Sequence, residues 1–111
     1  MKSVLKLLAG AVFFCNAAAA GAQAVDADAA QALMKKSNCF KCHSLDKKKD
    51  GPAYQEVAAK LKGKPDAEQK LYTHLTTHPK IKIDGKEEEH VSLKTTDDAQ
   101  IKNVIRFILS Q

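Results

Sequence analysis

The segment Cys39-Phe40-Lys41-Cys42-His43 constrains this chain more than any other part of it. Cys-x-x-Cys-His is the pattern by which a protein holds a haem covalently. The two thiols add to the two vinyl groups of the porphyrin as thioethers, and the adjacent histidine lies beneath the iron as its proximal ligand. The motif therefore predicts one haem c held by Cys39, Cys42 and His43, with the chain folded around that large, flat group.

The same motif has two other interpretations. A Cys-x-x-Cys pair is typical of thiol-disulfide redox sites, but these lie near a strand-helix-strand pattern that the sequence lacks. Cys39, Cys42 and His43 with one more histidine would also supply four zinc ligands, and the spaced pair downstream is His74 with His78. The expected cellular compartment favours the haem interpretation, because covalent haem attachment of this kind takes place outside the cytoplasmic membrane. The chain begins with a predicted export signal.

That export signal is predicted over residues 1–24. Lys2 and Lys6 form a short basic start, residues 4–14 are mostly apolar, and residues 17–24 are mostly small. The apolar run of about ten residues is too short to span a bilayer comfortably, so a retained membrane anchor is not expected.

Cleavage is expected near residues 22–24, which discards Cys15 and leaves a mature chain over 25–111. The expected product is a periplasmic protein that does not span the membrane. It has about 87 residues, which is one small domain. Both of its cysteines belong to the haem motif, so no disulfide is available and the haem must form a large part of the core.

The apolar periodicity predicts an all-α domain of three to four helices, and no sustained alternation indicates a sheet. Residues 80–94 are expected to form a lysine-rich, acidic loop. The first expected helix is capped by Asp26 or Asp28 and runs into the haem motif, and the second covers 53–61 and ends at Gly63. The third begins at Pro65 and Asp66 and ends before Pro79. The last is capped by Thr96 and is expected to bury Ile101, Val104, Ile105 and Ile108.

Taken together, residues 33–109 resemble a small class I bacterial cytochrome c. The resemblance rests on the haem motif, on Gly51-Pro52-Ala53-Tyr54, on residues 57–60 with Gly63, and on an aromatic residue in the last helix, here Phe107. It implies the class I cytochrome c fold, in which the first and last helices cross behind the haem. It also implies that the carbonyl of Pro52 accepts a hydrogen bond from Nδ1 of His43.

The chain departs from that family at the second axial ligand, which is usually a methionine before the last helix. The one methionine of the mature chain, Met34, precedes the motif and is expected in the core. His90 stands seventeen residues before Phe107, close to the family's spacing, and is the predicted distal ligand. The alternatives are His78, on the same face as a buried leucine, and an open or water-bound site. His74 is expected to be solvated.

A bis-histidine iron is saturated, so it transfers electrons rather than binding oxygen or a substrate. The second imidazole should also give a lower potential than methionine does. The predicted function is therefore periplasmic electron transfer between redox partners. The alternatives are a haem sensor or ligand-binding protein with a labile sixth ligand, and an electron-transfer subunit of a dehydrogenase or oxidase. No acid-base or nucleophile constellation accompanies the motif, so an enzyme is not expected.

The net charge of the chain indicates which classes of partner it can bind. The whole chain has a formal charge of +5, and removing Lys2 and Lys6 leaves 16 basic against 13 acidic side chains, or +3. This surplus is too small to indicate nucleic-acid binding. The chain is expected to be a monomer whose partners are other redox proteins. The lysines near the haem motif have two interpretations: a rim that steers the haem edge toward an acidic partner, or a solvated loop that they only keep soluble. Six lysines bracket the haem motif, namely Lys35, Lys36, Lys41, Lys47, Lys48 and Lys49.

Overall fold

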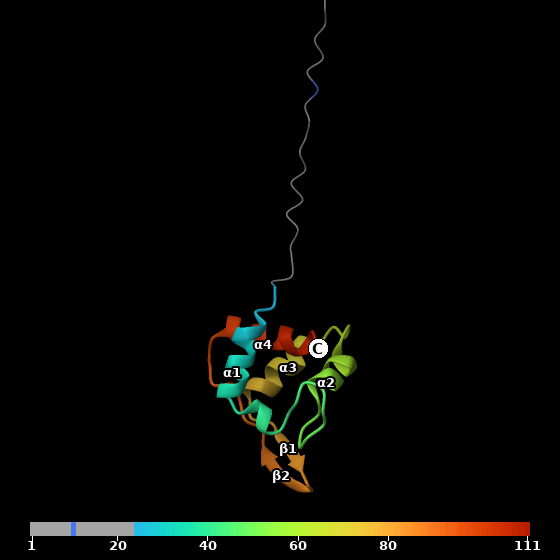
Figure 1. Ribbon diagram of the computed structural model, residues 1–111, viewed down its shortest axis with the longest axis vertical. Helices are drawn as coiled ribbons and strands as arrows, with labels where there is room; N and C mark the ends of the chain where they lie inside the picture. The colour runs from blue at the N-terminus through green and yellow to red at the C-terminus, as the bar shows by residue number, and fades with distance from the viewer. Residues whose placement is uncertain (1–9, 11–23) are drawn as a thin grey trace, which may run out of the picture.

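The computed structural model describes Gly10 and residues 24–111, and the predicted export signal therefore lies almost wholly outside the described residues. Within them the chain forms a helical body and one small hairpin (Figure 1). The elements in order are α1 (Ala27–Lys36), the 3-10 turn η1 (Cys39–Lys41), α2 (Tyr54–Leu61), α3 (Ala67–Thr76), the strands β1 (Lys80–Ile83) and β2 (Lys86–Glu89), and α4 (Asp98–Leu109).

Helices α1 and α4 pack against each other at the start of the domain, as the resemblance predicts. Asp26 is the N-cap of α1, and its carboxylate accepts from the backbone N–H of Ala29 at 3.0 Å. The backbone N–H of Asp26 donates to the side-chain oxygen of Asn103 at 2.9 Å, and the amide of Asn103 donates back to the Asp26 carbonyl at 2.9 Å. This reciprocal pair fixes the first turn of α1 onto α4.

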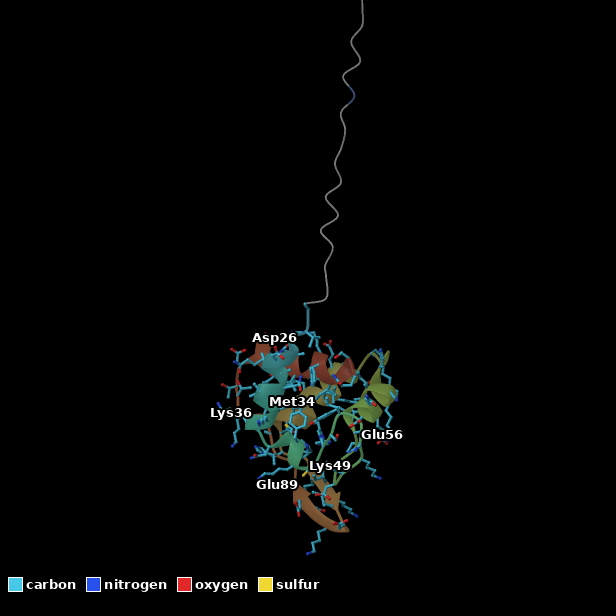
Figure 2. The ribbon with its side chains drawn as sticks, viewed as in Figure 1. Asp26, Met34, Lys36, Lys49, Glu56 and Glu89 are labelled. Carbon is cyan, nitrogen blue, oxygen red and sulfur yellow. The ribbon has the colours of Figure 1, made fainter. Side chains whose placement is uncertain are left out.

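The core lies around α4, which packs against α1, α2 and α3. Met34 is fully buried among the helices, as predicted (Figure 2). The predicted stripe of α4 is also buried, and Phe107 joins it at 4% exposure. The expected cap of this helix is wrong by one residue: Asp97, not Thr96, accepts from the N–H of Gln100 at 3.1 Å. A carboxylate at that position also interacts favourably with the helix dipole.

The β1–β2 hairpin corrects the expected loop over 80–94. Asp84 and Gly85 both have positive φ, 51° and 77°, which a two-residue turn between paired strands requires. The strands pair antiparallel, with Ile81 opposite Glu88, and Ile81 and Ile83 are half-buried while their neighbours are exposed. The hairpin projects from the helical body at the end opposite α4 (Figure 1). It is the one part of the described fold that departs from the all-α prediction.

The remaining helices are short and begin and end close to the predicted residues. Helix α2 has 8 residues and follows Ala53 as its N-cap, and α3 has 10 residues and ends three residues before Pro79. Of the helices in the described part of the chain, none combines the length and the apolar character needed to cross a bilayer.

Candidate haem-binding site

A cavity of about 520 Å³ opens between the Cys-x-x-Cys-His motif, helices α2 and α3, and the hairpin. This volume is within the roughly 300–1,000 Å³ typical of cofactor sites. Cys39, Cys42 and His43 line it, and so do His74 and His90. Its apolar wall is formed by Leu61, Leu71, Leu75, Ile81, Ile83 and Ile108.

The two cysteines are presented by a single tight turn. Asn38 adopts a left-handed backbone conformation with φ of 61°, so the chain changes direction after α1 and enters η1. Side chains three residues apart eclipse on a 3-10 turn, so Cys39 and Cys42 face the same way. Neither cysteine is in a disulfide, and burial is the main cause that raises the pKa of the Cys39 thiol. In residues 24–111, no three Cys, His, Asp or Glu side chains converge as metal ligands.

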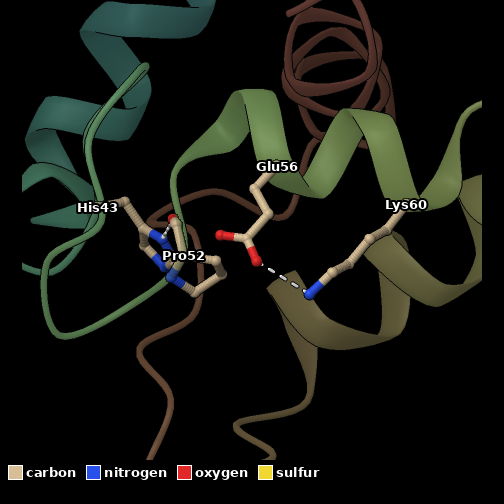
Figure 3. A network of polar contacts seen from close by, with 4 residues as sticks. All are labelled: His43, Pro52, Glu56 and Lys60. Atoms are coloured by element: carbon tan, nitrogen blue, oxygen red, sulfur yellow. Dashed lines mark hydrogen bonds and ion pairs between the residues drawn. The ribbon is translucent and has the colours of Figure 1, made fainter.

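His43 is held by a hydrogen bond to the residue that the resemblance indicates. Its Nδ1 lies 2.7 Å from the carbonyl oxygen of Pro52 (Figure 3). Because a carbonyl only accepts, Nδ1 must carry the hydrogen, and the lone pair is left on Nε2. This bond fixes both the tautomer and the direction of the nitrogen that can bind a metal.

Two further residues hold the His43 ring, and sequence reasoning gave neither a role. Tyr54 stacks on the imidazole with a centroid distance of 4.8 Å and an angle of 25° between the planes. On Gly51, a Cβ atom would lie 2.5 Å from Cε1 of His43, so any side chain there would push the ring away. The signal was present in the motif Gly51-Pro52-Ala53-Tyr54, where the glycine precedes the residue that binds His43.

Two histidines lie on the other side of the cavity from different elements. The ring of His90, just after β2, has its centroid 6.2 Å from that of His43, and the planes make an angle of 58°. The ring of His74, on α3, has its centroid 4.0 Å from that of His90, at 47°. Burial, and then the neighbouring His74 and His43, lower the pKa of His90 to about 4. Burial and His43 also lower the pKa of His74. Both rings are therefore neutral at pH 7, the state in which imidazole binds a metal.

The structure corrects the expectation for His74 and disfavours the alternative ligand His78. His74 is half-buried against His90 rather than solvated. The signal was its position three residues after the buried Leu71, which places it on the same helical face. His78 is exposed, has φ of 50° beyond the end of α3, and is not among the residues that line the cavity.

Comparison with known proteins places this site in a family. The family model described as cytochrome c matches residues 27–111, which includes the motif and all the residues that line the cavity. The chain belongs to the cytochrome c family. Members carry one covalently bound haem c, and the paired thiols, the fixed imidazole of His43 and the apolar cavity fit that group. Haem would bond to Cys39 and Cys42 and supply the redox-active iron.

Named relatives agree with the family assignment. The chain is 44% identical over 50 residues to cytochrome c-551 of Pseudomonas aeruginosa, which is 45% of this chain and 48% of that protein. It is 46% identical over 48 residues to cytochrome c-552 of Nitrosomonas europaea, 43% of each protein. The matches thus span about half the length of these curated relatives.

Solved structures confirm the class I cytochrome c fold. The class 1 cytochrome MtoD from Sideroxydans lithotrophicus superposes with a TM-score of 0.75 at 52% identity, covering 78% of this chain and 97% of that chain. Cytochrome c552 of Nitrosomonas europaea superposes with a TM-score of 0.56 at 29% identity, covering 72% of this chain and 96% of that chain.

Proposed function

We propose that this cytochrome c is an exported electron carrier whose single haem iron is bound by His43 and His90. The observation that supports the ligand pair most directly is the distance between the two rings. Bonds between metals and imidazole nitrogens are about 2.0–2.1 Å long in zinc sites, and each ring adds roughly another 1.1 Å, so two imidazoles on opposite sides of one metal have centroids about 6.3 Å apart. The observed separation of His43 and His90 is 6.2 Å.

The orientation of the rings is compatible with the same arrangement. Two axial imidazoles share the ligand–metal axis and are free to rotate about it, so the angle of 58° between the planes does not oppose joint ligation. The neutral state of His90 leaves a nitrogen lone pair available. His90 also occupies the chain position, before the last helix, from which the family usually supplies methionine.

Saturation of the iron by two imidazoles determines the function. With no open position, the haem exchanges single electrons and does not readily bind oxygen or carbon monoxide. Imidazole in place of methionine favours a lower potential. A sensor or ligand-binding protein, the main alternative, requires a sixth position that is open or labile.

The wild-type holoprotein is expected to be six-coordinate and low-spin. The ferric form should lack the near-infrared band of sulfur-to-iron charge transfer, because no sulfur binds the iron, and its electron paramagnetic resonance should be that of a bis-imidazole haem. The ferrous form should react slowly with carbon monoxide. A high-spin ferric spectrum together with rapid carbon monoxide binding would contradict the carrier and favour the sensor.

Export to a periplasm is part of the proposal. It rests on the predicted signal over residues 1–24, followed by the cytochrome domain over 25–111. Covalent haem attachment outside the cytoplasmic membrane requires that route. The partners are then redox proteins of the same compartment, and we propose that the carrier works as a monomer without an enzymatic activity of its own.

Docking is proposed to use the lysines next to the haem motif. Lys47 and Lys48 are exposed, whereas the ammonium group of Lys49 donates to the carbonyl of Phe40 at 2.8 Å and so also stabilises the motif. Exposed charges at the edge of a docking surface mainly raise the rate at which a partner of opposite charge is encountered. An acidic surface on the redox partner is the complementary chemistry.

Charge reversal of Lys47 and Lys48 to glutamate is therefore expected to slow electron exchange with the physiological partner. The loss should be about tenfold or more at low salt and should shrink at high salt, because exposed charges are screened. Stopped-flow kinetics at several ionic strengths would measure it. Reversal of Lys62 and Lys64, exposed between α2 and α3, is the matched control. Equal effects of the two double variants would indicate a response to net charge alone.

A further inference from the structure

We propose that Ser37 is a positioning residue for the distal ligand: its hydroxyl holds the segment that carries His90 against the end of α1, next to the haem motif. This inference rests on the proposed ligation of the iron by His90. Three observations support it, namely the irregular backbone around His90, a hydrogen bond that joins the two sides of the cavity, and the burial of the hydroxyl that accepts this bond.

The segment that carries the proposed distal ligand has no regular structure of its own. Residues 90–97 lie between β2 and α4 and are neither helix nor strand. Val91, the residue next to the ligand, is 55% exposed and does not anchor the segment. Parts of a chain with few buried contacts open locally more easily than the core does. The position of the His90 imidazole therefore depends on the contacts that hold residues 90–97 on the rest of the fold.

Two hydrogen bonds tie this segment to α3 and to the residues just after it. The backbone N–H of His90 donates to the carbonyl of Pro79 at 2.8 Å, and that of Leu93 donates to the carbonyl of Leu75 at 2.9 Å. The side chain of Leu93 is buried and belongs to the core. These contacts hold the segment on the α3 side of the cavity, and none of them involves the haem motif.

A third hydrogen bond joins the segment to the other side of the cavity. The backbone N–H of Lys94 donates to Oγ of Ser37 at 2.9 Å, over a separation of 57 residues. Ser37 is the C-cap of α1, lies two residues before Cys39, and lines the cavity. Within residues 24–111, no other hydrogen bond connects residues 90–97 with α1 or the haem motif. The bond therefore links the proximal motif to the distal segment through the protein itself.

The burial of the Ser37 side chain gives its hydroxyl a specific role. Ser37 is 1% exposed and is the one polar residue among the buried residues of the described chain. Burying a hydroxyl is unfavourable unless the hydroxyl is hydrogen-bonded. The backbone of Ser37 is fixed as well, because its N–H donates to the carbonyl of Leu33 at 2.9 Å. Ser37 thus offers Lys94 an acceptor at a fixed place, which an alanine of similar size would lack.

This hydrogen bond should limit how easily the distal ligand leaves the iron. Carbon monoxide can bind only after His90 has moved away, so its binding rate follows the fraction of molecules in which the segment is open. Loss of one partner of an intramolecular hydrogen bond shifts such an equilibrium by about tenfold. Ferrous Ser37→Ala is therefore expected to bind carbon monoxide about tenfold faster than wild type, while its resting iron stays low-spin.

Stopped-flow mixing of the reduced holoproteins with carbon monoxide measures this rate. Asn103→Ala is the matched control, because it removes the two hydrogen bonds between Asn103 and Asp26, and neither residue lines the cavity. It should lower the stability to denaturant and leave the carbon monoxide rate at the wild-type value. Equal acceleration in both variants would show that Ser37 acts only through overall stability, and this would overturn the positioning role. A wild-type rate in Ser37→Ala would overturn it too.

Hydrogen exchange of the ferrous holoprotein tests the bond itself, whichever histidine binds the iron. The Lys94 amide should exchange slowly in wild type and about tenfold faster in Ser37→Ala, whereas the Leu93 amide, whose acceptor is the Leu75 carbonyl, should stay protected. Rapid exchange of the Lys94 amide in wild type would overturn the proposal even if Ser37→Ala yields no holoprotein. A protected Lys94 amide in a wild type that is high-spin would contradict ligation by His90 and leave the hydrogen bond itself confirmed.

Discussion

Mutation of both Cys39 and Cys42 to alanine is expected to leave no stably folded, haem-bearing protein. Cys39 and Cys42 would hold the haem through two thioether bonds, and both face the cavity from one turn. Without them the haem is held only by its axial ligands and by contacts with the apolar wall. Single replacements should give intermediate yields, since one thioether remains.

The size of the cavity explains why the effect should be large. Without haem, water would enter a cavity of about 520 Å³, and its apolar wall would lose the contacts that haem would supply. Small domains are stable by only about 5–15 kcal/mol in total. Exposure of that wall is therefore expected to remove a large part of the stability of the domain. The haem is therefore a structural part of the core as well as the redox centre.

Intact mass spectrometry of the exported protein would measure this result. Wild type should appear as the cleaved chain plus one haem that survives acid-acetone extraction. Cys15→Ala is the matched control, because Cys15 lies in the segment that is expected to be removed. It should leave mass, yield and haem content unchanged. An extractable haem in the wild type, or zinc in its place, would contradict covalent attachment.

Much of the proximal side could be predicted from the sequence because its interactions are local. The haem motif spans five residues, and the partner of His43 follows nine residues later on the same loop. The stripe of α4 and the burial of Met34 follow from helical periodicity alone, and the structure confirms both. When interacting residues are close in sequence, or apolar residues recur at helical spacing, few other local structures are compatible with the segment.

The distal side could not be predicted as fully, because it joins elements that are far apart in sequence. His74 and His90 come from α3 and from the end of the hairpin, and only the tertiary fold shows that their rings touch. The hairpin was missed because its strands carry six lysine and glutamate residues beside two isoleucines, a composition typical of a charged loop. The Asp84-Gly85 turn was the signal that would have revealed it.

Replacement of His90 with alanine is expected to convert the iron from low-spin to a high-spin or water-bound form. The variant removes the distal nitrogen and leaves a space next to the haem into which water or carbon monoxide fits. Carbon monoxide should then bind the ferrous protein rapidly, whereas the wild type reacts slowly. His78→Asn is the control, because His78 is exposed with φ of 50° and asparagine tolerates that conformation.

Substitution of His90 by methionine tests the same assignment in the opposite direction. If the thioether reaches the iron, the near-infrared sulfur band should appear and the potential should rise, because axial ligand identity is a main determinant within the roughly 0.8 V range of protein haems. Potentiometry and absorption spectra of the two variants measure these changes. Potentiometry and spectra of the histidine variants would also reveal a wrong ligand assignment. A bis-imidazole spectrum that persists in His90→Ala and disappears in His78→Asn would show that the ligand comes from the segment just after α3. The iron would still be saturated in that case and the chain an electron carrier, since saturation depends on the presence of two imidazoles rather than on which loop supplies the second.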